Sequence, residues 1–101
     1  MNPVTIAEIR AAIRERDYVG LHRLYEQIKT HGIERCDQEL AATVGLSILE
    51  CSLFGDADQT NLRTLGVMLD AIERGNHPYE DPIAGVYFEA DAAISKAELD
   101  A

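Results

Sequence analysis

Apolar residues recur three and four positions apart along most of the chain, which is the spacing of an amphipathic α-helix. Thr5-Ile6-Ala7-Glu8 has the form of a capping box, so the spacing predicts a first helix after Thr5. Asp17 is the predicted N-cap of a second helix that Gly32 ends. The two form a hairpin or one helix kinked near Asp17. Their apolar stripes are Ile6, Ile9 and Ile13, then Tyr18, Leu21, Leu24, Tyr25 and Ile28.

A third helix is predicted to begin at Cys36 or Asp37 and to end at Phe54, before Gly55. It is apolar on nearly all sides, which is typical of a buried helix. One side carries Leu40, Val44, Ile48 and Cys51, and the opposite side carries Leu46, Leu49 and Leu53. Ala41, Ala42 and Gly45 would let neighbouring backbones approach closely. We therefore expect this helix to be the central one.

Two further helices follow. Asp56 or Asp58 is the predicted cap of the fourth, which ends before Gly75. Asp81-Pro82 predicts the start of the fifth, since Asp caps helices and Pro favours their first position. The apolar stripe of the fourth helix is Leu62, Leu65, Leu69 and Ile72. The predicted buried face of the fifth is Ile83, Val86, Tyr87, Ala90, Ala93, Ile94 and Ala97.

Composition agrees with an all-helical fold. Apolar residues make up 47% of the 101 positions, Trp is absent, and Phe and Tyr together supply six side chains. The core must then be built from Leu, Ile, Val and Ala, and no segment alternates as a β-strand does. The predicted fold class is all-α: a compact bundle of about five helices around a central buried helix (about 36–54), with residues 1–101 forming a single helical domain.

The negative charge is uneven along the chain. Residues 1–52 carry eight acids and six bases, a balance of −2, whereas residues 53–101 carry ten acids and three bases, a balance of −7, which together give the net −9. This asymmetry argues against direct binding to nucleic acid or to an anionic membrane, because both need basic patches. It permits a protein partner with a basic surface, although acidity serves solubility alone equally often.

Basic residues in the first half stand among acids, so we interpret them as a solvated face with local ion pairs. They are Arg10, Arg14, Arg16, Arg23 and Arg35. The most apolar stretch, 40–49, contains Thr43 and Ser47 and is too short to span a bilayer. Met1-Asn2-Pro3 is not followed by a secretory signal pattern, and the predicted location is cytoplasmic.

Metal and thiol chemistry find little support in the sequence. Cys36 and Cys51 lack a metal-ligand spacing and are predicted to be buried free thiols, with a single disulfide as the alternative. Asp56 begins a segment that resembles a calcium loop, but Asn61 and Val67 occupy the positions that need Gly and Glu. His22 and Glu26 lie one turn apart, which is weak evidence for a metal. We predict no metal and no cofactor.

Catalysis has one candidate cluster, His77 with Tyr79, Glu80 and Asp81, in the loop before the last helix. A histidine beside carboxylates can perform acid–base chemistry, but a short loop on a small domain offers little shelter from water. Phosphate-binding loops and a nucleophile elbow are missing from the sequence. We therefore predict a turn with a helix cap at this loop and a protein that is not an enzyme.

The same loop is a better candidate for a contact surface. His77, Pro78 and Tyr79 are semi-rigid and amphipathic, as interface anchors often are. On the last helix Phe88, Ala92, Ser95 and Leu99 form an apolar stripe opposite the predicted core face, with Glu89, Asp91, Glu98 and Asp100 around it. The alternative is that this stripe packs on the first two helices, leaving Ile83 and Val86 to the central helix. The predicted partner-binding residues are His77, Tyr79, Glu80, Asp81, Phe88, Glu89, Asp91, Ala92 and Leu99.

The leading hypothesis is a small acidic protein-binding module or inhibitor that acts by protein–protein contact. In a sharper version its carboxylates imitate the phosphates of a nucleic acid and occupy a basic groove, as small acidic inhibitors from phages and mobile elements do. The alternative is a structural or regulatory homo-oligomer formed through the C-terminal helix, with Phe88 and Leu99 in its seam. A metal-binding or acid–base enzyme is the least favoured hypothesis.

Overall fold

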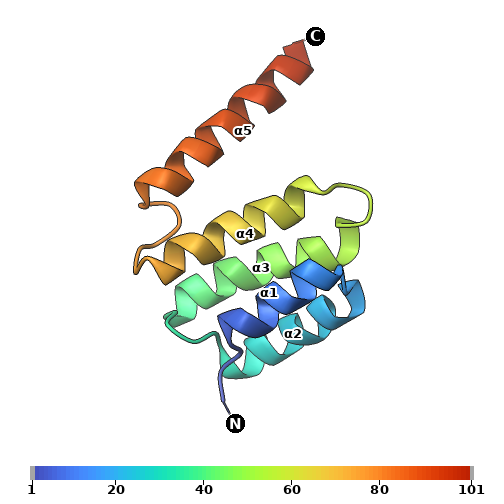
Figure 1. The fold of residues 1–101 in the computed structure, drawn as a ribbon, viewed down its shortest axis with the longest axis vertical. Coiled ribbons are helices and arrows are strands. Elements are labelled where there is room, and N and C mark those ends of the chain that lie inside the picture. Colours follow the sequence, from blue (N-terminus) through green and yellow to red (C-terminus); the bar gives the residue numbers. More distant parts are fainter. Residues whose placement is uncertain (1, 101) are drawn as a thin grey trace. The chain divides into compact units, whose positions relative to one another are not determined.

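The computed structural model describes residues 2–100 and confirms the all-α prediction (Figure 1). These residues form five helices and no β-strand. In chain order the helices are α1 (Ile6–Glu15), α2 (Tyr18–His31), α3 (Gln38–Phe54), α4 (Thr60–Glu73) and α5 (Pro82–Asp100). None of the helices in this part of the chain has the length and apolar character that crossing a membrane requires.

Contacts along the chain divide it into two units. The first unit ends at Gly66 and the second begins at Val67, so the boundary lies inside α4. The prediction that residues 1–101 form a single domain stays a prediction.

Local hydrogen bonds at the helix ends explain why the first three helices begin where they do. Thr5 and Glu8 form the predicted capping box, with the Glu8 amide donating to the Thr5 hydroxyl at 3.1 Å. Asp17 caps α2 through the Gly20 amide at 2.9 Å, and Asp37 caps α3. Arg16 lies between α1 and α2 in the left-handed region, with φ of 50°. The chain therefore forms two helices joined by a tight turn, and not one kinked helix.

Within the first unit, α2 contacts both α1 and α3. Gly45 lies where α3 packs against α2, because a Cβ at this position would lie 3.4 Å from Ile28 Cγ2. A larger side chain at this position would crowd Ile28. The prediction that the small residues Ala41, Ala42 and Gly45 let neighbouring backbones approach closely stays a prediction.

The segment before α1 is tied to the turn that follows α2. Val4 and Ile33 form an isolated parallel bridge, in which the Val4 amide donates to the Gly32 carbonyl at 3.0 Å and the Glu34 amide donates to the Val4 carbonyl at 2.9 Å. The Ile6 amide also donates to Glu34 Oε1 at 3.0 Å. Gly32, with φ of 74°, supplies the left-handed backbone that this turn requires.

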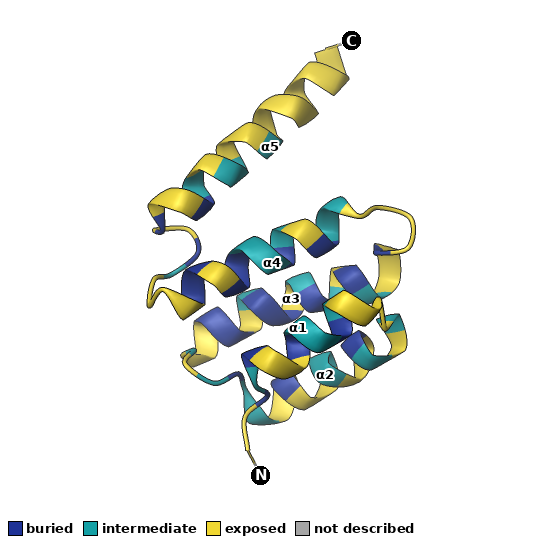
Figure 2. Ribbon diagram, in the orientation of Figure 1, coloured by how far each residue is buried: buried dark blue, intermediate teal, exposed yellow. Residues whose placement is uncertain are grey.

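One side of α3 lies in the core of the first unit (Figure 2). Val44, Ile48 and Cys51 are fully buried, as predicted. The opposite side is not buried, because the side chains of Leu46 and Leu53 are 58% and 57% exposed. The prediction that α3 is buried nearly all round is therefore wrong for these two residues.

The second unit shows a larger departure from prediction. In α5 only Ala84 is buried, whereas Ile83, Val86 and Ile94 are 65%, 68% and 59% exposed. Tyr87 is half-buried, and the rest of the predicted core face, Ala90, Ala93 and Ala97, is exposed. The predicted buried face of α5 is therefore wrong. Helical spacing correctly aligned these residues, but spacing does not reveal whether the same chain covers the face that they form.

Candidate protein-binding surface

The loop between α4 and α5 is fixed by its own backbone. After α4, Gly75 adopts a positive φ of 84°, and the amides of Glu80 and Asp81 both donate to the His77 carbonyl, at 2.9 and 3.0 Å. Pro78 is fully buried within this turn. The loop is therefore a turn with internal hydrogen bonds and a buried proline, and these hold its backbone in place.

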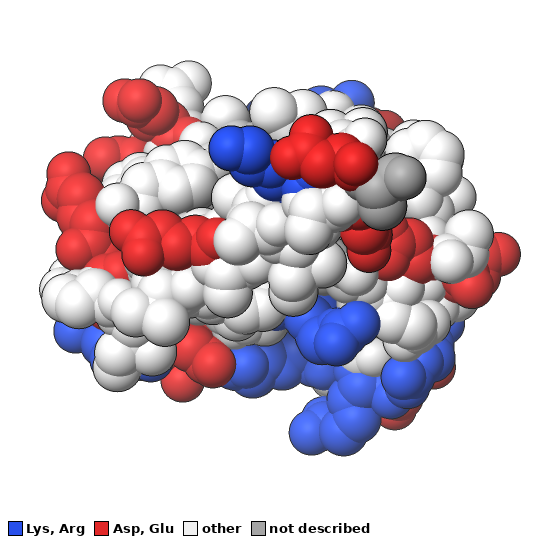
Figure 3. All heavy atoms as spheres, turned by 90° about the horizontal axis from the view of Figure 1, so that it is seen from above, with Lys and Arg blue, Asp and Glu red and all other residues white. Residues whose placement is uncertain are grey.

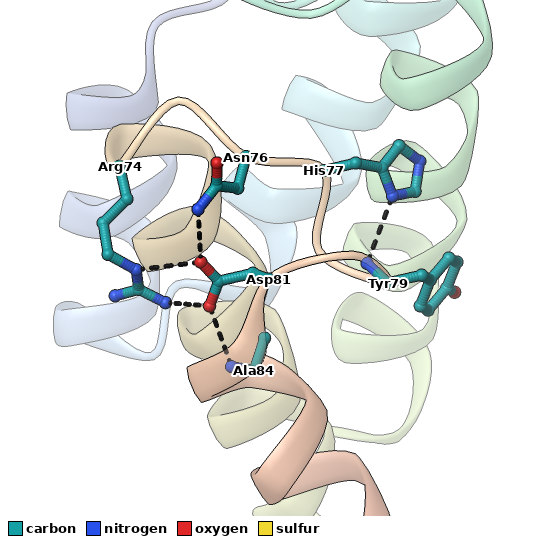
Figure 4. Close-up of polar contacts among 6 residues, drawn as sticks. All are labelled: Arg74, Asn76, His77, Tyr79, Asp81 and Ala84. Carbon is teal, nitrogen blue, oxygen red and sulfur yellow. Dashed lines mark hydrogen bonds and ion pairs between the residues drawn. The ribbon is translucent and has the colours of Figure 1, made fainter.

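Asp81 is the anchor of the loop and the N-cap of α5 (Figure 4). Its side chain is buried, and it accepts from Arg74 Nε at 3.1 Å, Arg74 Nη2 at 2.6 Å, Asn76 Nδ2 at 2.8 Å and the Ala84 amide at 2.9 Å. These bonds, led by those from Arg74 and Asn76, hold the pKa of the Asp81 carboxyl well below its usual range. Asp81 is therefore ionised and fully occupied inside the chain.

Four aromatic rings follow one another from the loop onto α5. The ring centroids of His77 and Tyr79 lie 5.4 Å apart, those of Tyr79 and Phe88 lie 5.8 Å apart, and those of Phe88 and Tyr87 lie 5.7 Å apart. The Tyr79 amide also donates to His77 Nδ1 at 3.1 Å. Tyr79 is nevertheless 65% exposed, so it presents an aromatic surface whose position is fixed by its neighbours.

The predicted partner-binding residues divide into three groups by exposure. Tyr79, Glu80, Glu89, Ala92 and Leu99 are exposed, and Leu99 is exposed most, at 86%. His77, Phe88 and Asp91 are half-buried. Asp81 differs from the rest because its carboxylate is buried, and this residue caps α5 instead of facing a partner.

Acidic side chains dominate the second unit. Residues 67–101 carry eight acids and the two bases Arg74 and Lys96, a balance of −6, whereas residues 1–66 carry ten acids and seven bases, a balance of −3. Figure 3 shows one face of the whole chain, on which Asp and Glu side chains lie among uncharged ones and Lys and Arg side chains gather mainly in the lower part of the view. Arg74, before the loop, forms an ion pair with Asp81. Lys96 is the single base in residues 76–101.

In the predicted acid–base cluster, His77 and Asp81 each have hydrogen-bond partners of their own. His77 Nδ1 accepts from a backbone amide, and both oxygens of Asp81 are bonded to Arg74, Asn76 and Ala84. The two side chains therefore have separate structural partners. Helix capping likewise accounts for Asp58, whose Oδ1 accepts from the Thr60 amide at 3.0 Å and whose pKa is lowered by that bond.

Metal-ligating side chains do not gather among residues 2–100, where no group of three or more His, Cys, Asp or Glu could hold an ion. Glu26 pairs with Lys29 at 2.9 Å, and the ring of the exposed His22 lies 6.3 Å from that of Tyr25. Glu26 therefore contacts Lys29 and His22 lies near Tyr25, and neither belongs to a group of described residues that could hold an ion.

Both cysteines are free thiols, as predicted, but only Cys51 is fully buried. Cys51 Sγ donates to the Asn61 carbonyl at 3.2 Å, and burial raises the pKa of this thiol to about 11. Cys36 is half-buried and lines a groove of about 720 Å³ beside the end of α2 and the start of α3. Burial also raises the pKa of the Cys36 thiol, so it is protonated and poorly nucleophilic at neutral pH.

Sequence reasoning missed a basic groove in the first unit. Arg14, Arg16 and Arg63 line a hollow of about 590 Å³ together with Ile13, Gln59 and Leu62. Arg16 Nη2 and Nε donate to Gln59 Oε1 at 3.0 and 3.3 Å. No sequence signal could have assembled this set, because Arg63 is distant from the other two arginines along the chain.

Comparisons of the chain with protein-family models, with curated proteins and with solved structures found no match.

Proposed function

We propose that this chain acts by binding another protein, through a surface made of the loop 76–81 and one side of α5. The contact residues are Tyr79, Glu80, Phe88, Asp91, Ala92 and Leu99, and we call this set the loop–helix surface. The observation that carries the proposal is Tyr79, which is 65% exposed although its ring is held between those of His77 and Phe88. A fixed aromatic side chain that loses little freedom on binding is a typical interface anchor.

Charge supports a partner with a basic surface. Residues 76–101 carry the six acids Glu80, Asp81, Glu89, Asp91, Glu98 and Asp100 against the one base Lys96. With Asp81 enclosed, five carboxylates remain to attract a cationic protein and to speed its association. The cytoplasm stays the predicted compartment, and two unpaired thiols fit a reducing environment.

The narrower form of the proposal, in which the carboxylates stand in for the phosphates of a nucleic acid, rests on this acidity alone. It expects the partner to be a nucleic-acid-binding protein and the chain to compete with that nucleic acid. A partner without such a groove would remove the narrower form and leave the broader one in place.

The test is affinity capture of the partner from the native host, with matched variants. Tyr79→Ala and Leu99→Asp should each weaken capture by at least about tenfold, because they remove the aromatic anchor and charge the apolar stripe. Val19→Asp is the control, since Val19 is 74% exposed on α2 in the first unit. Reversing Glu80, Asp91 and Glu98 to Lys should abolish the salt-sensitive part of binding. Capture that is equally strong in all variants would refute the proposal.

A further inference from the structure

The side of α5 that the sequence marks as a core face remains exposed. Ile83, Val86, Ala90, Ala93 and Ala97 recur at intervals of three and four residues, and all are exposed. This is the alternation of a and d positions in a helix pair, so we call these five residues the α5 seam. Phe88 lies on the other side of the helix, where its ring contacts that of Tyr79. The α5 seam is therefore distinct from the loop–helix surface.

Charge on either side of the seam indicates what covers it. In the same heptad frame Glu89 and Lys96 occupy the g positions, and Tyr87 and Ile94 occupy the e positions. Glu89 and Lys96 are both exposed. They lie seven residues apart, roughly 10 Å along one helix, which is too far for them to form an ion pair within α5.

A second copy of α5 running in the opposite direction matches four of the five seam residues and both flanks at once, and it sets Ile83 against the partner's Asp100. Antiparallel pairing about a two-fold axis sets Ala90 against the partner's Ala93 and Val86 against the partner's Ala97. The same register brings Glu89 to the partner's Lys96 on one flank and Tyr87 to the partner's Ile94 on the other. Because the axis repeats each contact, the pair gains two ion pairs and two apolar flanking contacts.

The competing arrangements lack this match. Parallel pairing would set Glu89 near the partner's Ile94, so the carboxylate would gain no cation. A basic partner would leave Lys96, the one cation of α5, facing like charge. Three alanines along the seam allow the helix axes to approach closely, which favours a partner helix that is equally narrow there. A second α5 has that property.

We propose that the chain forms an antiparallel homodimer through the α5 seam. Dimerisation would leave Tyr79, Asp91 and Leu99 outside the seam, so it is independent of the protein-binding function proposed above. Each dimer would then present two copies of the loop–helix surface, which would strengthen binding to a partner with repeated sites.

The test is the mass of the full chain in solution, measured by sedimentation equilibrium from low micromolar to submillimolar concentration. The wild-type chain should be a dimer, and Val86→Asp should be a monomer with unchanged helical content by circular dichroism. Glu89→Lys and Lys96→Glu should each weaken the dimer by at least about tenfold, because each sets like charges against one another at two symmetric points. The double variant E89K/K96E should restore dimerisation.

The matched control is Ser95→Asp, an exposed position on the far side of α5 that should leave the dimer intact. A wild-type monomer at every concentration would overturn the inference, and so would a dimer insensitive to Val86→Asp. Failure of the double variant to recover would overturn the antiparallel register. None of these results bears on Tyr79→Ala or Leu99→Asp, so loss of the dimer and loss of the captured partner can be told apart.

Discussion

The two most apolar helices of the chain, α3 and α5, have opposite surroundings. In α3 six residues are buried, among them Val44 and Ile48, which are fully enclosed. In α5 only Ala84 is buried, and its large aliphatic side chains are exposed. In both helices the apolar pattern thus identifies a face that burial would stabilise. It does not say whether the cover comes from the same chain, and for α5 we propose that it comes from a second chain.

The largest expected effect is on the buried side of α3. Ile48→Ala should lower the free energy of unfolding by about 2–5 kcal/mol, because it leaves a cavity where the side chain is fully enclosed. Chemical denaturation followed by circular dichroism measures this change. A loss below about 1 kcal/mol would contradict the enclosed position of Ile48 and would weaken the contrast with α5.

The caps of the two helices give the next test. Asp81→Asn should destabilise the second unit at neutral pH and reduce helical content, because it removes the ion pair with Arg74. Asp37→Asn should change little, since Asn caps a helix as well as Asp does and Asp37 is exposed. Thermal unfolding of the two variants beside the wild type measures the difference. Equal effects at the two caps would show that the Arg74 pair contributes nothing.

Lowering the pH should reduce the effect of the same variant. Because the pKa of Asp81 is lower in the folded chain than in the unfolded one, its stabilising contribution is complete above its unfolded pKa of about 3.9 and is lost as the pH falls further toward the folded value. The stability difference between wild type and Asp81→Asn should therefore shrink below about pH 4. A difference that stays constant from pH 7 to pH 3 would exclude this linkage.

A smaller difference between the two helices is expected in the alkylation rates of their thiols. Cys51 on α3 has a pKa of about 11, whereas a cysteine placed at Ser95 on α5 should keep a pKa near 8.5 because the position is exposed. In a Cys36→Ser background, the alkylation rate of Cys51 should be slow and still rising at pH 10, while that of Ser95→Cys should level off near pH 9. Similar profiles for the two thiols would place Cys51 outside the core.

The smallest effect is expected at the end of α5. Leu99→Ala should change the free energy of unfolding by no more than about 0.5 kcal/mol, since the side chain is 86% exposed. Denaturant titration at a concentration where the oligomeric state is known measures this value. A loss comparable to that of Ile48→Ala would mean that Leu99 is covered in solution.

The sequence allowed the helix boundaries to be predicted well, because each depends on a few neighbouring residues. Thr5, Asp17 and Asp81 all bond to amides within three positions, and such contacts can be inferred from spacing alone. Tyr79 and Phe88 were singled out from the sequence because they stand in a turn-rich, acidic context, and their role in binding a partner stays a prediction.

Two kinds of feature could not be predicted from the sequence. One is a contact between residues from different segments, and the other is whether an apolar helix face is buried. The enclosure of Asp81 required Arg74 and Asn76 to converge on it from before the turn. The exposure of Ile83 and Val86 was missed because periodicity is the same for a core face and for an interface.

The pairing of Val4 with the turn after α2 has a consequence for how the first unit opens. The amides of Val4 and Glu34 lie outside every helix, yet each is bonded to the other side of this junction. They can exchange with solvent only when the two ends of the α1–α2 hairpin separate, so they should show hydrogen-exchange protection similar to that of the helices. The residues just before α1 thus belong to a cooperative folding unit instead of to a fraying end.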